Sequence, residues 1–324
     1  KWKKIPGADI PLIEYVSDNC IRKKIRNYIL KPRYDHRFRG YDVVQIVNPG
    51  IFPWMAGYKP IHDLHKYNDK VFVSVAGDDY YTYKAWKNGV FEYSHYLYEN
   101  NDRLKRAHGM SIASIVSDAL TRKTMNEADG IIPTNAYDYQ MPYRDFKNLR
   151  RTILLPINLE NIKYNDNTVI DKKIIFFHGI NREEDKGSNY IVEAMRQIQA
   201  EYPNDVDCIV EGKMPYDDYI NFMKKVNVVI DQCRGFGYGM NALIAMAQGK
   251  IVMSGAESEI KASLKGECPI INIRPSVKQI KKEIMILIEN KHNIKEYGIK
   301  SRNFVEENHN HLKIAKQYLD EWNK

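Results

Sequence analysis

The stretch that decides the fold is "VVIDQCRGFGYGMNALIAMAQGKIVMSG", residues 228–255. It begins with an apolar β-branched run that predicts a buried strand, passes through a turn containing Gly235, Gly237 and Gly239, and continues as an apolar helical run. A second strand-like run, 250–255, follows, and this order predicts a βαβ unit with parallel strands. The backbone N–H groups at the start of the helix can bind an anion, whereas the glycines also allow a strand and a helix to pack closely. Both interpretations stay open at this point.

The same alternation extends along the chain in both directions. Strands are expected at 41–52, 70–80, 128–135 and 151–158 in the first half, and at 173–179, 207–212, 226–232, 250–255 and 269–273 in the second. Helices are expected at 109–130, 186–202, 215–226, 238–249 and 256–264. Most strand runs are continuously apolar, as in a sheet that helices cover on both faces. The sequence therefore predicts an α/β protein of two Rossmann-like, doubly wound parallel-sheet domains that face a central cleft.

The domain boundaries follow from length and from a polar stretch. A chain of 324 residues suits two domains, and the Asn-rich segment 154–173 resembles a linker. We expect an acceptor-binding domain at 1–160, a nucleotide-sugar-binding domain at 161–305, and a C-terminal helix at 306–324 that packs back on the first domain. The chain begins "KWKKIPGADI", without an initiator Met, so the first domain can lack its first strand.

The net charge of +8 is concentrated at the start of the chain. Residues 1–40 hold eleven Lys and Arg against four Asp and Glu, so +7 of the +8 lies there. Within this segment, 15–32 has the spacing of a basic amphipathic helix, which is either a solvated surface or a face for an anionic membrane. Nucleic acid is not expected, because no recognition motif accompanies the basic run. No apolar run approaches the roughly 20 residues of a membrane span.

Cysteines and histidines predict no metal site. The four cysteines, Cys20, Cys208, Cys233 and Cys268, have no ligand spacing and are expected to be reduced thiols of a cytoplasmic protein. The pairs His62 and His65, and His309 and His311, lack a third ligand and are expected to be polar surface.

Two cations follow the first strand of the second domain. In "INREEDKGSN", residues 180–189, Arg182 and Lys186 are four positions apart in a polar turn just before a helix. The glycine turn after 226–232 would lie at the same edge of a parallel sheet. A guanidinium, an ammonium and a helix N-terminus together predict a diphosphate site. Glu211, Asp231 and Gln232 also stand at strand ends and could contact a sugar or a base.

Residues 178–195 and 228–255 together resemble the C-terminal, donor-binding domain of retaining GT-B glycosyltransferases, a group that includes bacterial capsule, O-antigen and exopolysaccharide transferases. The resemblance covers about 171–275 and reaches the first half only as a general strand pattern. In that family the turn usually reads E-G-F-G-L-V-A-L-E-A-M-A, and "FGYGMNALIAMA", 236–247, is similar to it. The implied donor-binding residues are Arg182, Lys186, Gly187, Phe236, Gly237, Tyr238, Gly239, Met240, Asn241 and Ile244. Glu211 is added to them from its place at a strand end.

The resemblance departs from the family at two positions. The family's two glutamates, which contact the transferred sugar and the ribose, fall on Phe236 and Ile244, and neither side chain can accept a hydrogen bond. Ile244 also extends an apolar helix face, as a core residue would.

The resemblance implies a hexosyl-type glycosyltransferase (EC 2.4) that moves a sugar, with retention, from a UDP- or GDP-linked donor to a glycan or lipid-linked glycan in surface polysaccharide biosynthesis. It implies no prosthetic group and no metal, with catalysis by Arg182 and Lys186. The expected location is cytoplasmic and peripheral on the inner face of the membrane. The alternative is a degenerate homologue that binds a glycan or nucleotide as a scaffold.

On the acceptor side, "SVAGDDYYTYK", 74–84, follows a first-domain strand. Asp79, or its neighbour Asp78, could orient or deprotonate an acceptor hydroxyl, and nearby tyrosines could stack on sugar rings. A helix cap formed by Asp and packed by Tyr is the other interpretation.

Overall fold

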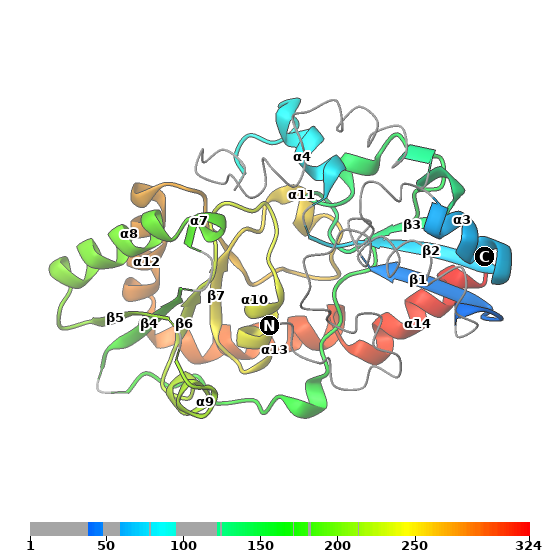
Figure 1. Cartoon of the computed structure of the whole chain (residues 1–324). Helices are drawn as coiled ribbons and strands as arrows, with labels where there is room; N and C mark the ends of the chain where they lie inside the picture. The colour runs from blue at the N-terminus through cyan, green and yellow to red at the C-terminus, as the bar shows by residue number, and fades with distance from the viewer. Residues whose placement is uncertain are drawn as a thin grey trace, which may run out of the picture.

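The computed structural model describes residues 38–47, 59–77, 79–94, 122–123, 125–170, 172–180, 183–212 and 214–324. In these ranges the chain forms two parallel sheets, which lie apart at opposite ends of the molecule (Figure 1). We call the parts built on them the first and second domains. Two-sheet α/β architecture is the fold class that the strand and helix alternation predicts.

The first sheet has the order β1-β2-β3 and is parallel throughout. Its strands are β1 (Val43–Val47), β2 (Lys70–Val75) and β3 (Gly130–Pro133). Two helices accompany them, α3 (Lys59–Tyr67) and α4 (Tyr80–Lys87), with short 3-10 turns at η6 (Met141–Tyr143) and η7 (Leu159–Asn161).

The second sheet has the order β5-β4-β6-β7-β8, also parallel. Its strands are β4 (Ile174–Gly179), β5 (Val206–Glu211), β6 (Val228–Ile230), β7 (Ile251–Ser254) and β8 (Ile271–Asn272). The chain moves from β4 outward to β5 and then returns to the other side of β4 for β6. This reversal is a topological switch point, where the crevice outside the carboxyl ends of the strands binds ligands in doubly wound folds.

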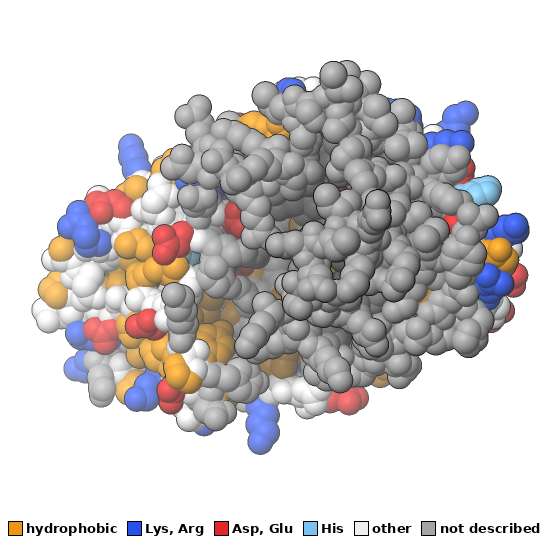
Figure 2. Space-filling view, in the orientation of Figure 1, with side chains coloured by type: hydrophobic (Ala, Val, Ile, Leu, Met, Phe, Trp, Pro, Cys, Tyr) orange, Lys and Arg blue, Asp and Glu red, His pale blue; other side chains and the backbone are white. Residues whose placement is uncertain are grey.

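Helices cover both faces of the second sheet. One apolar core joins it to α8 (Ser188–Glu201) and α12 (Val277–Glu289), and another joins it to α9 (Tyr216–Met223), α10 (Met240–Ala247) and α13 (Ile294–Asn308). Short elements complete the domain: α7 (Glu183–Lys186), α11 (Ser258–Lys261) and η8 (Lys291–Asn293). Lys, Arg, Asp and Glu side chains are interspersed over this end of the surface (Figure 2).

The last helix, α14 (His311–Trp322), leaves the second domain and packs on the first sheet (Figure 1). Ile314 is buried against a cluster that includes Phe72 of β2. Trp322 fixes the far end of the helix, because its indole N–H donates to Gln45 Oε1 at 3.0 Å and its carbonyl accepts from Lys70 Nζ at 2.7 Å. The C-terminal segment therefore ties the two domains together.

Two expectations from the sequence need correction, and a third agrees with the described residues. Residues 151–158, predicted as a strand, form no regular strand and make an isolated bridge between Ile157 and Asn310. His309, predicted at the surface, is 1% exposed, and its Nδ1 lies 2.8 Å from the Leu155 carbonyl. Of the helix expected at 109–130, residues 122–123 and 125–127 are described and are helical as expected, and β3 begins at Gly130.

The basic segment 1–40 lies outside the described residues except for 38–40. None of the helices in the described ranges combines the length and the apolar composition that a membrane-spanning segment requires.

Candidate functional site

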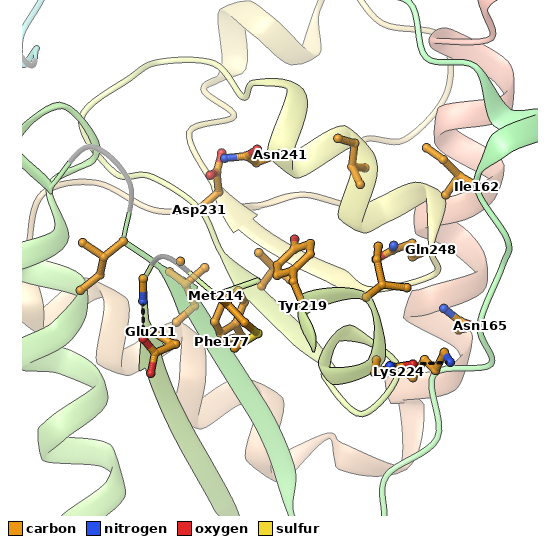
Figure 3. A pocket seen from close by; sticks show the side chains of 18 of the residues that line it. Ile162, Asn165, Phe177, Glu211, Met214, Tyr219, Lys224, Asp231, Asn241 and Gln248 are labelled. Atoms are coloured by element: carbon orange, nitrogen blue, oxygen red, sulfur yellow. Dashed lines mark hydrogen bonds between the residues drawn. The ribbon is translucent and has the colours of Figure 1, made fainter. Parts of the chain in front are cut away.

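A cavity of about 920 Å³ opens at the switch point of the second sheet (Figure 3). Its walls include Gly179, Glu211 and Asp231, which stand at the carboxyl ends of β4, β5 and β6. The β4–β5 register pairs Gly179 with Glu211, so these two ends lie side by side. Asn241 and Ile244 of α10 form another wall. The cavity is therefore where a doubly wound sheet places a ligand.

The interior of this cavity is part polar and part apolar. In Figure 3 the Tyr219 ring lies between Met214 and Gln248, and Asp231 lies beside Asn241. Glu211, the predicted polar contact after β5, is exposed there and its Oε1 accepts from the Gly212 N–H at 2.9 Å. These surroundings suit a flat apolar ring that carries polar groups at its edge, and a nucleobase is such a ring.

Lys186 lines the cavity, and it is paired. Its Nζ lies 2.7 Å from Asp231 Oδ1, and the two side chains are 4% exposed each. Asp231 follows β6, and Lys186 ends α7, so the pair connects two elements that flank the switch point. Among the described residues the carboxylate partner of Lys186 is Asp231, and an ammonium with three N–H groups can donate to a second anion as well. Arg182, the other predicted cation, lies outside the described residues.

Gly187 is required by packing at this point. Its φ is 73°, in the left-handed region, and a Cβ would lie 2.6 Å from Cys233 Sγ. The Cys233 N–H donates to the Lys186 carbonyl at 2.9 Å, which joins α7 to the glycine turn. The described residues thus give Gly187 a structural reason that is independent of any donor contact.

His178, which no sequence motif indicated, connects β4 to β6 and to the start of α8. It is fully buried in β4, with Nδ1 2.7 Å from the Ile230 carbonyl and Nε2 2.8 Å from Ser188 Oγ. A carbonyl only accepts, so Nδ1 carries the proton and Nε2 accepts from the serine hydroxyl. Burial lowers the pKa of His178, which keeps the ring neutral. No motif pointed to it, since a single histidine in an apolar strand gives no signal.

The glycine turn divides into two parts with different environments. At Gly239 a Cβ would meet nothing within 4 Å, and the next residues, Met240 and Asn241, are exposed at the start of α10. The first N–H groups of that helix have no partner within it and so remain available to an anion.

At the other end of the turn, the first domain already supplies an anion. The N–H groups of Phe236 and Gly237 donate to the two carboxylate oxygens of Asp138, at 3.2 and 2.8 Å. Here a Cβ at Gly237 would collide with Asn135 Nδ2. Gly237 is therefore needed for close approach of the two domains.

The side chains of the turn face the protein interior. The Phe236 ring stacks on Tyr93, with centroids 4.4 Å apart and planes inclined by 9°, and is 6% exposed. Phe91 and Tyr137 of the first domain lie against the same ring. Tyr238 points the other way, with its hydroxyl 3.0 Å from His309 Nε2.

Position 244 faces the large cavity. Ile244 is half-buried against the α10 core and also forms part of the cavity wall. At this position the ligand would therefore meet an apolar surface, in contrast with the ribose-binding glutamate that the resemblance implied.

Asp79 is corrected. Its carboxylate is 2% exposed and caps α4, accepting from Thr82 N at 2.9 Å and from the Tyr143 hydroxyl at 2.7 Å. Burial raises the pKa of Asp79. The role expected for it with an acceptor hydroxyl does not fit this geometry, because the carboxylate is enclosed by its own helix and by Tyr143. Asp78 lies outside the described residues.

Among the described residues no group of three or more His, Cys, Asp or Glu is placed to hold a metal ion. Cys208, Cys233 and Cys268 are free thiols, and burial raises the pKa of Cys233 to about 12. That thiol packs against Gly187, and the raised pKa disfavours the thiolate, the form in which a cysteine acts as a nucleophile.

Comparisons with known proteins agree with the fold. No protein-family model matches the chain. A protein of Methanocaldococcus jannaschii described as an uncharacterized glycosyltransferase is 31% identical over 129 residues, which is 39% of this chain and 33% of that protein. The chain thus matches about a third of the length of this relative.

Solved structures cover more of the chain at lower identity. Sucrose-phosphate synthase from Thermosynechococcus elongatus superposes with a TM-score of 0.65 at 16% identity, over 95% of this chain and 80% of that one. TarM of S. aureus, solved with fondaparinux, α-GlcNAc-glycerol and UDP, gives 0.61 at 13% identity, over 92% and 59%. These similarities confirm the GT-B fold class that the sequence predicted.

Proposed function

We propose that this protein is a glycosyltransferase that takes its sugar from a nucleotide-diphosphate donor. One observation carries the proposal: a cavity of about 920 Å³ at the switch point of the second sheet holds Lys186 and opens beside the N-terminus of α10. An ammonium and a helix N-terminus are the groups that a diphosphate needs. The GT-B fold supports this assignment.

In this reaction the bond between the anomeric carbon and the diphosphate oxygen breaks, and the electron pair stays on the diphosphate. The acceptor hydroxyl forms the new bond to carbon, and its proton passes to the leaving diphosphate. Lys186 and the first N–H groups of α10 would stabilise the charge that develops on the leaving diphosphate. Arg182, from its place in the sequence, is proposed to act with them.

The finer assignments are proposals from the sequence resemblance. These are transfer of a hexose-like unit with retention and without a metal, a UDP- or GDP-linked donor, and a glycan or lipid-linked glycan acceptor in surface polysaccharide biosynthesis. We also propose a cytoplasmic location with the basic segment 1–40 on an anionic membrane surface. UDP is the first nucleotide to test, since TarM was solved with it.

The test exploits opposite effects on folding and on binding at Asn241. Asn241 is the second residue of α10 and lines the cavity. An Asp there favours the helix by about 0.3–1 kcal/mol, because it complements the positive end of the helix dipole. The same charge repels a diphosphate.

We therefore expect Asn241→Asp to leave the melting temperature unchanged or higher and to abolish UDP or GDP binding in calorimetry. Asn241→Ala is the matched control and should keep most of the affinity. Equal nucleotide affinity in wild type and Asn241→Asp would show that no phosphate binds at this helix.

A second function, binding without transfer, is favoured by Phe236 and Ile244. The Phe236 ring is enclosed by aromatic residues, and the Ile244 side chain forms an apolar part of the cavity wall. Neither position therefore offers a carboxylate to the donor. Tight nucleotide-sugar binding with no release of free nucleotide, in the presence of varied glycan acceptors, would favour the scaffold.

A further inference from the structure

A second cavity, of about 190 Å³, lies between the two domains. It adjoins the large one, because consecutive residues of the chain line the two cavities. Asp185 and Gln232 line the small cavity, and their neighbours Lys186 and Asp231 line the large one. A donor whose diphosphate lies near Lys186 would therefore have its sugar end at the entrance to the small cavity.

The small cavity is lined mainly by groups that form hydrogen bonds. The first domain contributes Thr82, Tyr93 and Asp138, and the second contributes Asp185, Gln232 and Arg234. The Phe236 ring forms part of the wall. Several convergent donors and acceptors beside one aromatic surface suit a small polyhydroxylated ring.

Asp138 holds a fixed place in this cavity. Its Oδ2 accepts from Gly237 N and from Asn135 Nδ2 at 2.8 and 3.0 Å, and its Oδ1 accepts from Phe236 N at 3.2 Å. Asn135 in turn holds the Asp138 loop, since its Oδ1 accepts from Tyr137 N at 2.8 Å. The carboxylate is thus oriented by both domains before a ligand binds.

The side chain at position 236 offers no polar group to a sugar, whereas Asp138 offers a carboxylate at the same turn. The Phe236 ring can neither donate nor accept a hydrogen bond, and its stacking on Tyr93 holds it in place. Asp138 reaches the same turn from across the cleft and brings a carboxylate to the backbone of residue 236.

We propose that Asp138 is a specificity-determining residue that binds hydroxyls of the donor sugar from the first domain. This inference rests on the proposed function. The nucleotide part of the donor needs the second domain alone, whereas the sugar part needs Asp138 and therefore both domains together.

The experiment compares nucleotide with nucleotide sugar. Titration calorimetry with UDP, UDP-glucose, GDP and GDP-mannose is run on wild type, Asp138→Asn and the control Asp145→Asn, a first-domain carboxylate that is 83% exposed. Hydrogen bonds to a charged group give an expected loss of about 10- to 100-fold in nucleotide-sugar affinity for Asp138→Asn. The affinity for the bare nucleotide should stay within about twofold, and Asp145→Asn should match wild type for both.

Two results would overturn this assignment while leaving nucleotide binding intact. One is an unchanged ratio of nucleotide-sugar to nucleotide affinity in Asp138→Asn. The other is tighter binding of both ligands by that variant, which would make Asp138 a carboxylate that competes with the donor. No binding of any nucleotide by wild type would overturn the proposed function and this inference together.

Asp138→Glu serves as a second variant should Asp138→Asn fail to fold. It keeps the charge that the turn N–H groups require, and its extra methylene extends the carboxylate further into the cavity. A changed order of preference among nucleotide sugars supports the inference, and an unchanged order with unchanged affinities contradicts it.

Discussion

The buried pair between Lys186 and Asp231 makes a prediction that separates stability from ligand binding. Nζ and Oδ1 are 2.7 Å apart, and both side chains are 4% exposed. Replacing Lys186 by Met preserves much of the volume of the side chain but leaves the Asp231 carboxylate buried without its cation. We expect Lys186→Met to lower the free energy of unfolding by about 3–5 kcal/mol, the usual effect of removing one partner of a buried ion pair.

The magnitude should depend on the second partner. In Lys186→Met/Asp231→Asn both charges are gone, and the remaining polar cost is that of one buried amide, about 1–3 kcal/mol. The double variant should therefore be more stable than Lys186→Met alone. Such non-additivity is expected for residues in direct contact.

The assay is urea unfolding of wild type, both single variants and the double variant, at neutral pH and without nucleotide. A matched control is the exposed pair Arg196 and Glu193, whose removal should change stability by no more than about 1 kcal/mol. If Lys186→Met unfolds within 1 kcal/mol of wild type, the ion pair is not buried as described. If the single and double variants lose equal stability, the stranded carboxylate is not the cause.

Three further changes probe other parts of the fold. Burial lowers the pKa of His309 from 6.5 to about 4, so the unfolded chain takes up a proton at this histidine at a higher pH than the folded chain does. The free energy of unfolding of wild type should therefore fall by about 3 kcal/mol between pH 6.5 and 4, relative to His309→Gln, in paired urea titrations. Burial likewise lowers the pKa of Lys250 to about 8, because burying the charged ammonium costs free energy. Lys250→Met should therefore raise the free energy of unfolding at pH 7 by about 2 kcal/mol, and a variant less stable than wild type would contradict this cost. Gly187→Ala, with φ at 73° and Cys233 in the way, should lower the melting temperature by several degrees, whereas Gly239→Ala, with open space around it, should melt like wild type in the same thermal scan.

Much of the second domain could be predicted because its signals are local. Apolar runs followed by turns and helical runs give β4, β5, β6 and β7 nearly where the structure has them. The first domain was harder. The run 151–158 is as apolar as a strand and begins beside β3, where Ile153 N donates to the Pro133 carbonyl at 2.9 Å. These hydrogen bonds do not continue as a ladder, so the run forms no regular strand.

The site shows the same division between local and distant information. Residues Lys186, Gly239 and Asn241 could be placed at one sheet edge, since strand ends and helix starts are local features and parallel strands bring them together. Of the two interpretations of Asp79, the geometry fits the helix cap, since its carboxylate accepts from Thr82 N. The sequence did not separate them, because a cap and an acceptor contact use the same residue type.

What the sequence by itself determined is the parallel α/β architecture of the second domain, the glycine turn at its switch point and the start of α10 directly after that turn, because backbone geometry and hydrophobic periodicity are set by neighbours along the chain. Only the tertiary structure decided the partners: Asp231 for Lys186, 45 residues away, and Asp138 for the amide of Gly237, 99 residues away. These pairs depend on how two separately folded sheets meet across a cleft. The surfaces that meet there are selected by packing and charge in three dimensions, and no pattern along the chain encodes that contact.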